Sequence, residues 1–151
     1  MEESIKVRGM FRIQIEDEEY GIVGDSGWCE NQITNLGFLN IINQLGTSLT
    51  GTKHSHIALG TGGTISSSAT SLTGEVTGRA ALTAASNGST ALQMTATFAS
   101  SDSFVTASRN LSNIGVFGAS AAGTLLSGNT YASSTCATNQ NVNVTYQWGF
   151  A

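Results

Sequence analysis

The sequence predicts a mainly β protein, an antiparallel β-sandwich of jelly-roll-like form with one short α-helix. Three observations support this fold class. Apolar and polar residues alternate with a period of two in most segments, as they do in strands with one buried face. Short turns rich in glycine and asparagine separate these segments. Apolar spacings of three and four residues occur convincingly only at residues 36–45. The length of 151 residues fits a single domain, residues 1–151.

The first predicted element is a hairpin over residues 5–23. Odd positions from Ile5 to Ile15 are apolar or glycine, and the even positions are polar apart from Met10. This alternation predicts a half-buried strand. Residues 16–19 form an acidic turn, and the return strand begins at Tyr20. We expect this acidic hairpin to contact partner proteins.

Residues 36–45 predict the helix. Its apolar residues are three positions apart: Leu36, Leu39, Ile42 and Leu45. Thr34 or Asn35 can cap its start, because their side chains accept a hydrogen bond from the first free backbone N–H groups. Gly46 follows the last turn, where a left-handed residue commonly ends a helix.

Strand signals resume after the helix. The predicted strands are residues 56–59, 82–85, 91–98, 114–117, 124–126 and 142–150. Asn87-Gly88 is a strong hairpin signal between the second and third of these strands, and residues 119–123 join the fourth to the fifth. A glycine-rich turn at 60–63 and a polar loop at 64–71 follow the first. With the N-terminal hairpin, this makes seven to nine closely spaced strands, as in a sandwich or barrel.

The composition argues against several function classes. Charged residues make up 11% of the chain, and six lysines and arginines are too few for a basic stripe that binds nucleic acid. No run of 18 apolar residues predicts a membrane span. Titratable groups are scarce, so we expect no enzyme, no catalytic residue, no cofactor and no metal.

Charge is concentrated near the N-terminus. Eight of the ten acidic residues lie in the first 30 positions, and no charged side chain follows Arg109. One interpretation is that the uncharged C-terminal strands contact other protein rather than bulk water. The other is that a strand surface of serine, threonine and asparagine is hydrated without charge.

The start of the chain and the cysteines indicate a cytoplasmic origin. Residues 1–6 are acidic and lack the apolar core of a secretory signal. Cys29 and Cys136 are too few for a disulfide framework or a zinc site. We expect two reduced thiols, with a single bridge as the alternative.

Several short patterns suggest chemistry. Gly24-Asp25-Ser26-Gly27 resembles the nucleophile segment of trypsin-like serine proteases, in which a histidine activates the serine. That family continues with glycine, whereas Trp28 follows here, and we expect a glycine-rich β-turn between two strands. Only His54 and His56 could supply the base.

The histidines and the glycine-rich turn have structural interpretations too. His54 and His56 are two positions apart, which on a strand puts both rings on one face, where they could share a metal ion. We expect ordinary strand histidines, with an ion on a trimer axis as the alternative. The turn Gly60–Thr64 lacks the lysine of a phosphate-binding loop.

The remaining candidates are isolated charges and aromatic rings. We expect Glu75 and Arg79 to form a structural ion pair or to contact a partner, and nothing in the sequence places Glu75 beside Asp102 as a glycosidase pair. Four aromatic side chains could stack on sugars: Trp28, Tyr131, Tyr146 and Trp148. Trp148 lies in register with the apolar face of the last strand, which favours core packing.

The order of these features resembles small structural proteins of tailed bacteriophages. The motifs are residues 6–13 (KVRGMFRI), 30–37 (ENQITNLG), 57–62 (IALGTG), 71–76 (SLTGEV) with Arg79, 113–117 (NIGVF), 123–127 (GTLLS) and 143–146 (NVTY). That family usually has an acid at the position of Asn113. The resemblance implies a non-enzymatic virion protein, made in the host cytoplasm.

Two roles follow from the resemblance. In the first, the protein is a capsid decoration (cement) protein that binds the major capsid protein and associates with its own copies as trimers through the uncharged C-terminal strands. In the second, it is a tail, baseplate or tail-fibre component that binds an adaptor or a host glycan. The length of the chain favours the first, because tail fibres are usually longer.

Overall fold

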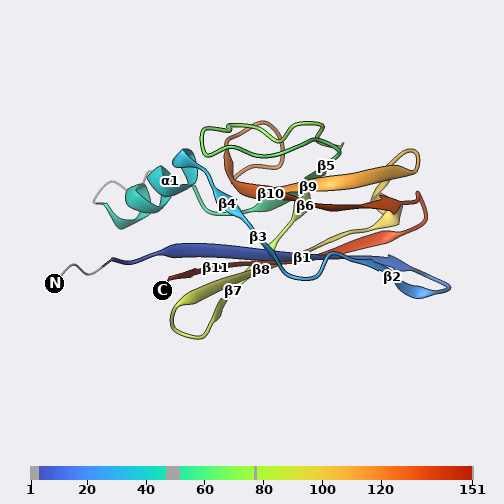
Figure 1. Cartoon of the computed structure of the whole chain (residues 1–151), viewed down its shortest axis with the longest axis horizontal. Coiled ribbons are helices and arrows are strands. Elements are labelled where there is room, and N and C mark those ends of the chain that lie inside the picture. The colour runs from blue at the N-terminus through green and yellow to red at the C-terminus, as the bar shows by residue number, and fades with distance from the viewer. Residues whose placement is uncertain (1–3, 47–51, 77, 151) are drawn as a thin grey trace.

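The computed structural model describes residues 4–46, 52–76 and 78–150. It shows two antiparallel sheets packed face to face, with a helix at one end (Figure 1). The first sheet contains β1 (Val7–Asp17), β2 (Gly21–Asp25), β3 (Cys29–Glu30), β7 (Thr83–Asn87), β8 (Ala91–Phe98) and β11 (Asn141–Phe150). The second contains β4 (Gln32–Ile33), β5 (His56–Gly60), β6 (Ala80–Ala81), β9 (Arg109–Phe117) and β10 (Leu125–Cys136). The helix is α1 (Asn35–Leu45), and a short 3-10 turn, η1, spans Ser100–Asp102. The predicted antiparallel β-sandwich is confirmed.

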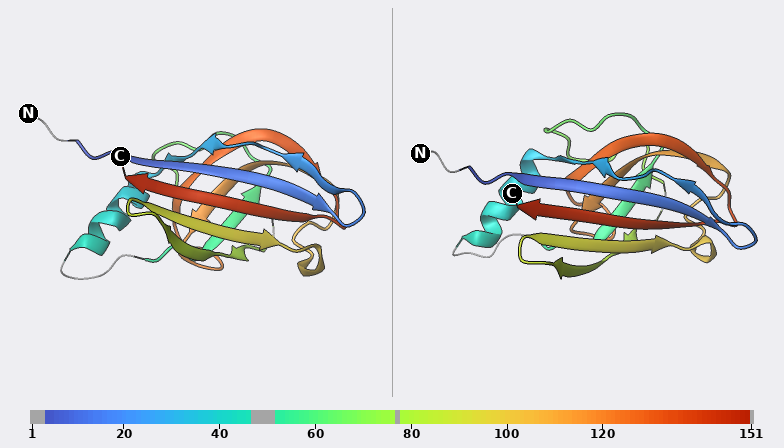
Figure 2. Two further views of the ribbon diagram at one scale, coloured as in Figure 1. Left: turned by 90° about the horizontal axis from the view of Figure 1, so that it is seen from below. Right: turned by 60° about the horizontal axis from the view of Figure 1, so that its bottom comes forward.

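The first sheet joins the two ends of the chain. Its strand order is β2-β1-β11-β8-β7, with β3 also paired to β1. The first and last strands pair along their whole length, from Val7 opposite Phe150 to Glu16 opposite Asn141. Both predicted alternations are present, so one face of this sheet supplies core side chains and the other is polar. Figure 2 shows β1 and β11 side by side, with the start of β1 and the end of β11 at the end of the sandwich where α1 lies.

The core contains a hydrogen-bonded polar cluster. Tyr146 is fully buried and stacks on Phe11, with 5.7 Å between the ring centroids. Its hydroxyl accepts a hydrogen bond from Asn31 Nδ2 at 2.7 Å and lies 3.0 Å from Ser127 Oγ. Trp148 Nε1 donates to the same Ser127 oxygen at 3.2 Å. Buried polar groups are costly unless they are bonded in this way.

The second sheet is covered on both faces. Residues 61–76 fold back over its outer face, where Ile65 and Leu72 form a second apolar cluster with side chains of β5, β9 and β10 (Figure 1). The loop approaches the sheet so closely that a Cβ on Gly128 would lie 2.7 Å from Ile65 Cδ1. This cover explains why β5 is almost continuously buried rather than alternating.

A buried asparagine anchors this loop. Asn113 is fully buried, and its Nδ2 donates to Thr73 O at 3.0 Å and to Gly63 O at 3.5 Å. A carboxylate at this position could not donate to either carbonyl. Asn113 therefore has a structural role in this chain.

Helix α1 is tightly fixed to β10. Thr34 is its N-cap, and its Oγ1 accepts a hydrogen bond from Gly37 N at 3.0 Å, as the sequence predicts. The same hydroxyl lies 2.7 Å from Leu125 O. A Cβ on Gly37 would lie 2.0 Å from Leu126 O, so only glycine permits this close packing. The left-handed conformation predicted for Gly46 is wrong: its φ is −79°, because its N–H bonds Ile42 O and the chain leaves the helix extended.

The strand boundaries differ from prediction in three places. The first hairpin turns one or two residues later, because β1 continues to Asp17 and the return strand runs over Gly21–Asp25. Strands β9 and β10 are longer than predicted, since their polar residues pair across two register shifts. Three two-residue strands, β3, β4 and β6, carry no alternation long enough to detect.

Candidate functional site

The most unusual surface of the molecule is the outward face of α1. Its exposed apolar side chains are Phe38 (43% exposed), Leu39 (48%), Ile42 (63%) and Leu45 (83%). The residues that the helix buries are instead Gly37 and Asn40. No charged residue occurs in the helix. An amphipathic helix normally turns its apolar face to the core, whereas this one leaves its apolar side chains exposed. We call these four side chains the docking face.

A cavity of about 450 Å³ lies between α1 and the end of the first sheet. Its apolar lining comes from three elements: Ile41 and Leu45 of α1, Ala84 and Leu92 of the β7–β8 hairpin, and Trp148 and Phe150 of β11. Its polar lining includes Asn40, Gln44 and His54. Among the described lining residues, Lys53 is the one cation. The cavity can therefore take an apolar group that has an acidic neighbour.

The two histidines of the sequence make different contacts. The His54 ring packs edge-on against Trp148, with 4.3 Å between centroids, and burial lowers the pKa of His54 to about 4. His54 is therefore neutral at pH 7, and its Nε2 has no hydrogen-bond partner among the residues that the structure describes. His56 instead places Nδ1 2.8 Å from Ser55 Oγ. Within the described residues, no three histidine, cysteine or acidic side chains are grouped to hold a metal ion.

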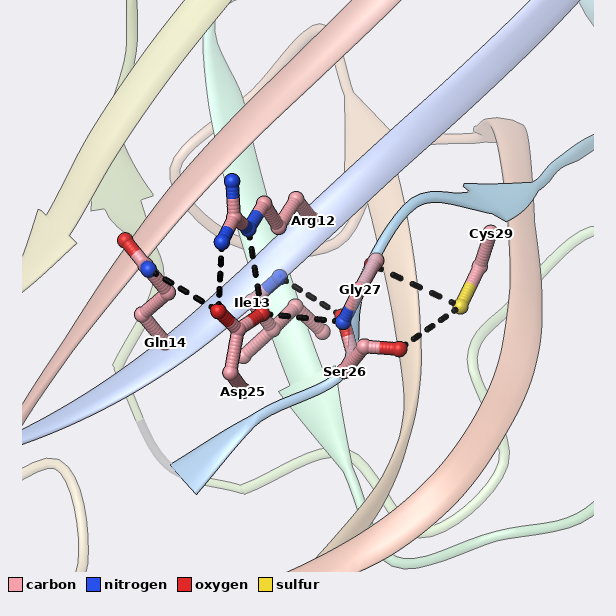
Figure 3. Close-up of polar contacts among 7 residues, drawn as sticks. All are labelled: Arg12, Ile13, Gln14, Asp25, Ser26, Gly27 and Cys29. Carbon is pink, nitrogen blue, oxygen red and sulfur yellow. Dashed lines mark hydrogen bonds and ion pairs between the residues drawn. The ribbon is translucent and has the colours of Figure 1, made fainter. Parts of the chain in front are cut away.

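The protease-like segment joins two strands at the edge of β1 (Figure 3). Asp25 accepts hydrogen bonds from Arg12 Nε at 3.0 Å and from Gln14 Nε2 at 3.1 Å. It also accepts from Gly27 N at 2.9 Å. The Arg12 guanidinium and these donors hold the pKa of Asp25 far below its usual range. Asp25 thus ties this segment to β1.

Ser26 has backbone partners rather than a catalytic base. Its Oγ donates to Gly27 O at 2.7 Å and accepts from Ile13 N at 2.9 Å. The segment was expected to form a β-turn, but the chain does not reverse, because β2 and β3 both pair with β1. One extra residue opposite β1 forms a bulge here, and Gly27 takes a φ of +65°. The hydrogen bonds of Ser26 make it part of this bulge.

Glu75 and Arg79 form the structural ion pair that was one of the two expectations. Arg79 Nε lies 2.6 Å from Glu75 Oε1, and the Arg79 side chain is only 6% exposed. The guanidinium also donates to Ala119 O and Ala122 O and lies 3.5 Å from the centroid of the Phe117 ring. This arginine fixes the β9–β10 turn.

The other predicted residues have separate locations. Asp102 is exposed on η1, whereas Glu75 is held by Arg79. The Gly60–Thr64 turn begins the covering loop and packs against the later part of that loop, where a Cβ on Gly62 would lie 2.2 Å from Thr73 O.

The structure also shows where the aromatic residues and the cysteines lie. Trp148 is a core residue, as predicted, and Trp28 is 47% exposed. Cys29 and Cys136 are free thiols, which confirms the first of the two expectations. Burial raises the pKa of Cys136 to about 11.

The docking face and the cavity could not be recognised from sequence. The spacing of apolar residues in α1 predicts a helix but does not say which way the helix faces. The signal that was present is the lack of any charged residue in α1, since a solvent-facing helix usually carries charges on its outer side.

Comparison with known proteins identifies no family for this chain. The chain matches no family model, no curated protein and no solved structure. Among the described residues, no helix has the length and apolar character needed to cross a bilayer.

Proposed function

We propose that the protein is a non-enzymatic structural protein of a tailed-bacteriophage virion, and specifically a decoration protein that binds and stabilises the capsid shell. Its partners are the major capsid protein and further copies of itself, arranged as trimers, and not nucleic acid or a membrane. In this proposal the chain is made in the host cytoplasm and ends in the virion.

The docking face of α1 is the observation that carries the proposal. Ile42 and Leu45 are among the most exposed apolar side chains of the described residues. Fully burying one such side chain contributes about 1.5–3 kcal/mol. Large exposed apolar patches on soluble proteins commonly mark protein–protein contacts. A helix that presents four such side chains therefore favours a role in assembly.

The way in which α1 is held supports the same role. Thr34 and Gly37 fix the helix to β10 by a cap and by close backbone packing. A docking element that is already positioned loses little conformational entropy when it binds. The fold thus supplies a preorganised apolar ridge.

The outer face of the first sheet is suited to many weak contacts. Its amide and hydroxyl side chains bond one another across strands, with Gln147 Nε2 3.2 Å from Gln93 Oε1 and Thr97 Oγ1 3.0 Å from Asn143 Oδ1. The part of this face formed by β8 and β11 carries amide and hydroxyl groups, and it adds little affinity per copy. On a lattice, many weak contacts act together through avidity.

Binding to empty shells tests the proposal. We expect wild-type protein to sediment with shells, and quantitative mass spectrometry of purified particles to find hundreds of copies. Ile42→Asp should weaken shell binding at least about tenfold, because a buried unpaired charge opposes docking. Trp28→Asp is the matched control, since Trp28 is 47% exposed and lies outside both α1 and the N-terminal hairpin. Wild-type binding by Ile42→Asp, or absence of the protein from particles, would contradict the proposal.

The tail or baseplate role is supported by one observation. Trp28 exposes 47% of its surface beside the bulge of residues 25–27, and an exposed indole can stack on a sugar ring. In that role, particles would contain only a few to dozens of copies. Trp28→Ala would then abolish glycan binding, whereas shell binding by a decoration protein would be unaffected.

A further inference from the structure

The cavity beside α1 and the chain that precedes β1 have complementary chemistry. We define the N-terminal arm as residues 1–6. Its described part, Ser4–Lys6, is exposed and leads away from the sandwich at the α1 end (Figure 2). Ile5 is 79% exposed and packs on no part of its own core. The Ile5 side chain is therefore available to bind in an apolar site elsewhere.

We propose that the N-terminal arm of one copy binds in the α1 cavity of a second copy, with Ile5 inserted between α1 and the β7–β8 hairpin. The cavity volume of about 450 Å³ is within the range of pockets that enclose a small ligand. It can take the isoleucine side chain together with adjoining main chain. Apolar groups of Leu92 and Trp148 supply the contacts.

Charge complementarity specifies the direction of the arm. Glu2 and Glu3 precede Ile5 in the sequence, and Lys53 is the cation among the described lining residues of the cavity. With Ile5 inserted, the acidic residues lie within reach of Lys53, because three extended residues span about 10 Å. The pairing sets the orientation more than it adds affinity.

The direction of the arm favours a second copy as the receiver. Val7, which follows the arm, pairs with Phe150 on one side of β11, whereas β7 and β8, which line the cavity, lie on the other side. Ser4–Lys6 lead away from the sandwich rather than into this cavity (Figure 2). An arm that leads outwards can reach a neighbour, and repeated head-to-tail contacts of this kind can close into a ring.

Complementation between two variants tests the inference with the full chain. Ile5→Asp removes the inserted group, and Ala84→Trp fills the cavity from the exposed strand β7. We expect light scattering to show an oligomer for wild type and a monomer for each variant alone, with association weakened at least tenfold. An equimolar mixture should form heterodimers, because one intact arm and one intact cavity remain.

Tryptophan fluorescence provides a direct readout of the cavity. In the Ile5→Asp, Trp28→Phe double variant, Trp148 is the single tryptophan. A peptide of residues 1–7 should shift its emission, and the same peptide with aspartate in place of isoleucine should not. Lys53→Glu should reduce peptide affinity about two- to fivefold, and peptides carrying Glu2→Lys and Glu3→Lys should restore it.

Three results would overturn the inference: a wild-type monomer at high concentration, an oligomer that Ile5→Asp leaves intact, or a mixture of the two variants that stays monomeric. A wild-type monomer would also contradict the self-association in the proposed function, but none of these results bears on shell binding, which Ile42→Asp tests separately. Failure of arm exchange and failure of the proposed function are therefore distinguishable.

Discussion

Asn113 shows how one side chain holds a large segment in place. Its amide donates to two carbonyl groups of the loop over the second sheet. One buried amide group thus holds the loop at two points, Gly63 and Thr73. The covering loop in turn lets β5 and β9 remain buried on both faces.

Asn113→Asp is expected to destabilise the protein by about 3 kcal/mol, because a buried carboxylate cannot donate to Thr73 O and meets its oxygen instead. Urea unfolding measures this loss, and a nonspecific protease should cut more rapidly within residues 61–76. Asn87→Asp, at an exposed strand position, is the control and should leave both measurements unchanged. Equal stability of the two variants would refute the anchoring role of Asn113.

His54 predicts a pH dependence of folding. Burial lowers its folded-state pKa to about 4, against an ordinary value of 6.5, so the unfolded chain binds more protons between these two pH values. Stability therefore falls as the pH drops from about 6.5 towards 4, by on the order of 3 kcal/mol. His54→Phe keeps a ring against Trp148 and should flatten the decline in urea unfolding from pH 7 to 4.5. Lys53→Gln, which removes a neighbouring charge but keeps the histidine, should retain the decline.

At the scale of elements, α1 combines a tightly fixed inner side with a free outer side. Gly37 and Thr34 bring it against β10, and the apolar stripe then points outwards. The helix is a short rigid ridge whose position depends on the absence of one methyl group.

Gly37→Ala tests this dependence. The new Cβ would lie 2.0 Å from Leu126 O, and relief of such overlap costs about 1–3 kcal/mol. We expect a lower unfolding midpoint and chemical-shift changes along α1 and β10. Gly63→Ala, which has open space around its Cβ, should change neither. If Gly37→Ala were as stable as wild type, close backbone packing would not position the helix.

The elements that could be predicted are those whose pattern is local. The alternation of β1 and β11 and the Thr34 cap are properties of neighbouring residues, and the structure confirms them. Strand β10 was predicted only in part, because its later residues, Asn129 to Cys136, have no alternation and pair across a register shift. The loop cover, the orientation of α1 and the cavity depend on contacts between distant segments, and no local pattern encodes them.

At the scale of the whole molecule, closure of the first sheet depends on both ends of the chain. β11 is bonded to β1 on one side and to β8 on the other. Neighbouring segments of the chain cannot complete this sheet by themselves. Its strand pairs join residues that are far apart in the sequence, and such contacts slow folding.

Removal of residues 141–151 should therefore abolish folding, because β11 is an inner strand of the first sheet and not an edge strand. We expect far-ultraviolet circular dichroism of the shortened chain to lack strand signal, and near-ultraviolet signals to be lost. Removal of residues 1–3, which precede β1, is the control and should leave both spectra unchanged. A folded shortened chain would show that β11 is dispensable.

The central place of the last strand also governs timing during synthesis. While the ribosome still holds the C-terminal residues, β1 and β8 have no shared neighbour, and the sandwich stays open. The sandwich can therefore close only after the segment that forms β11 has left the ribosome.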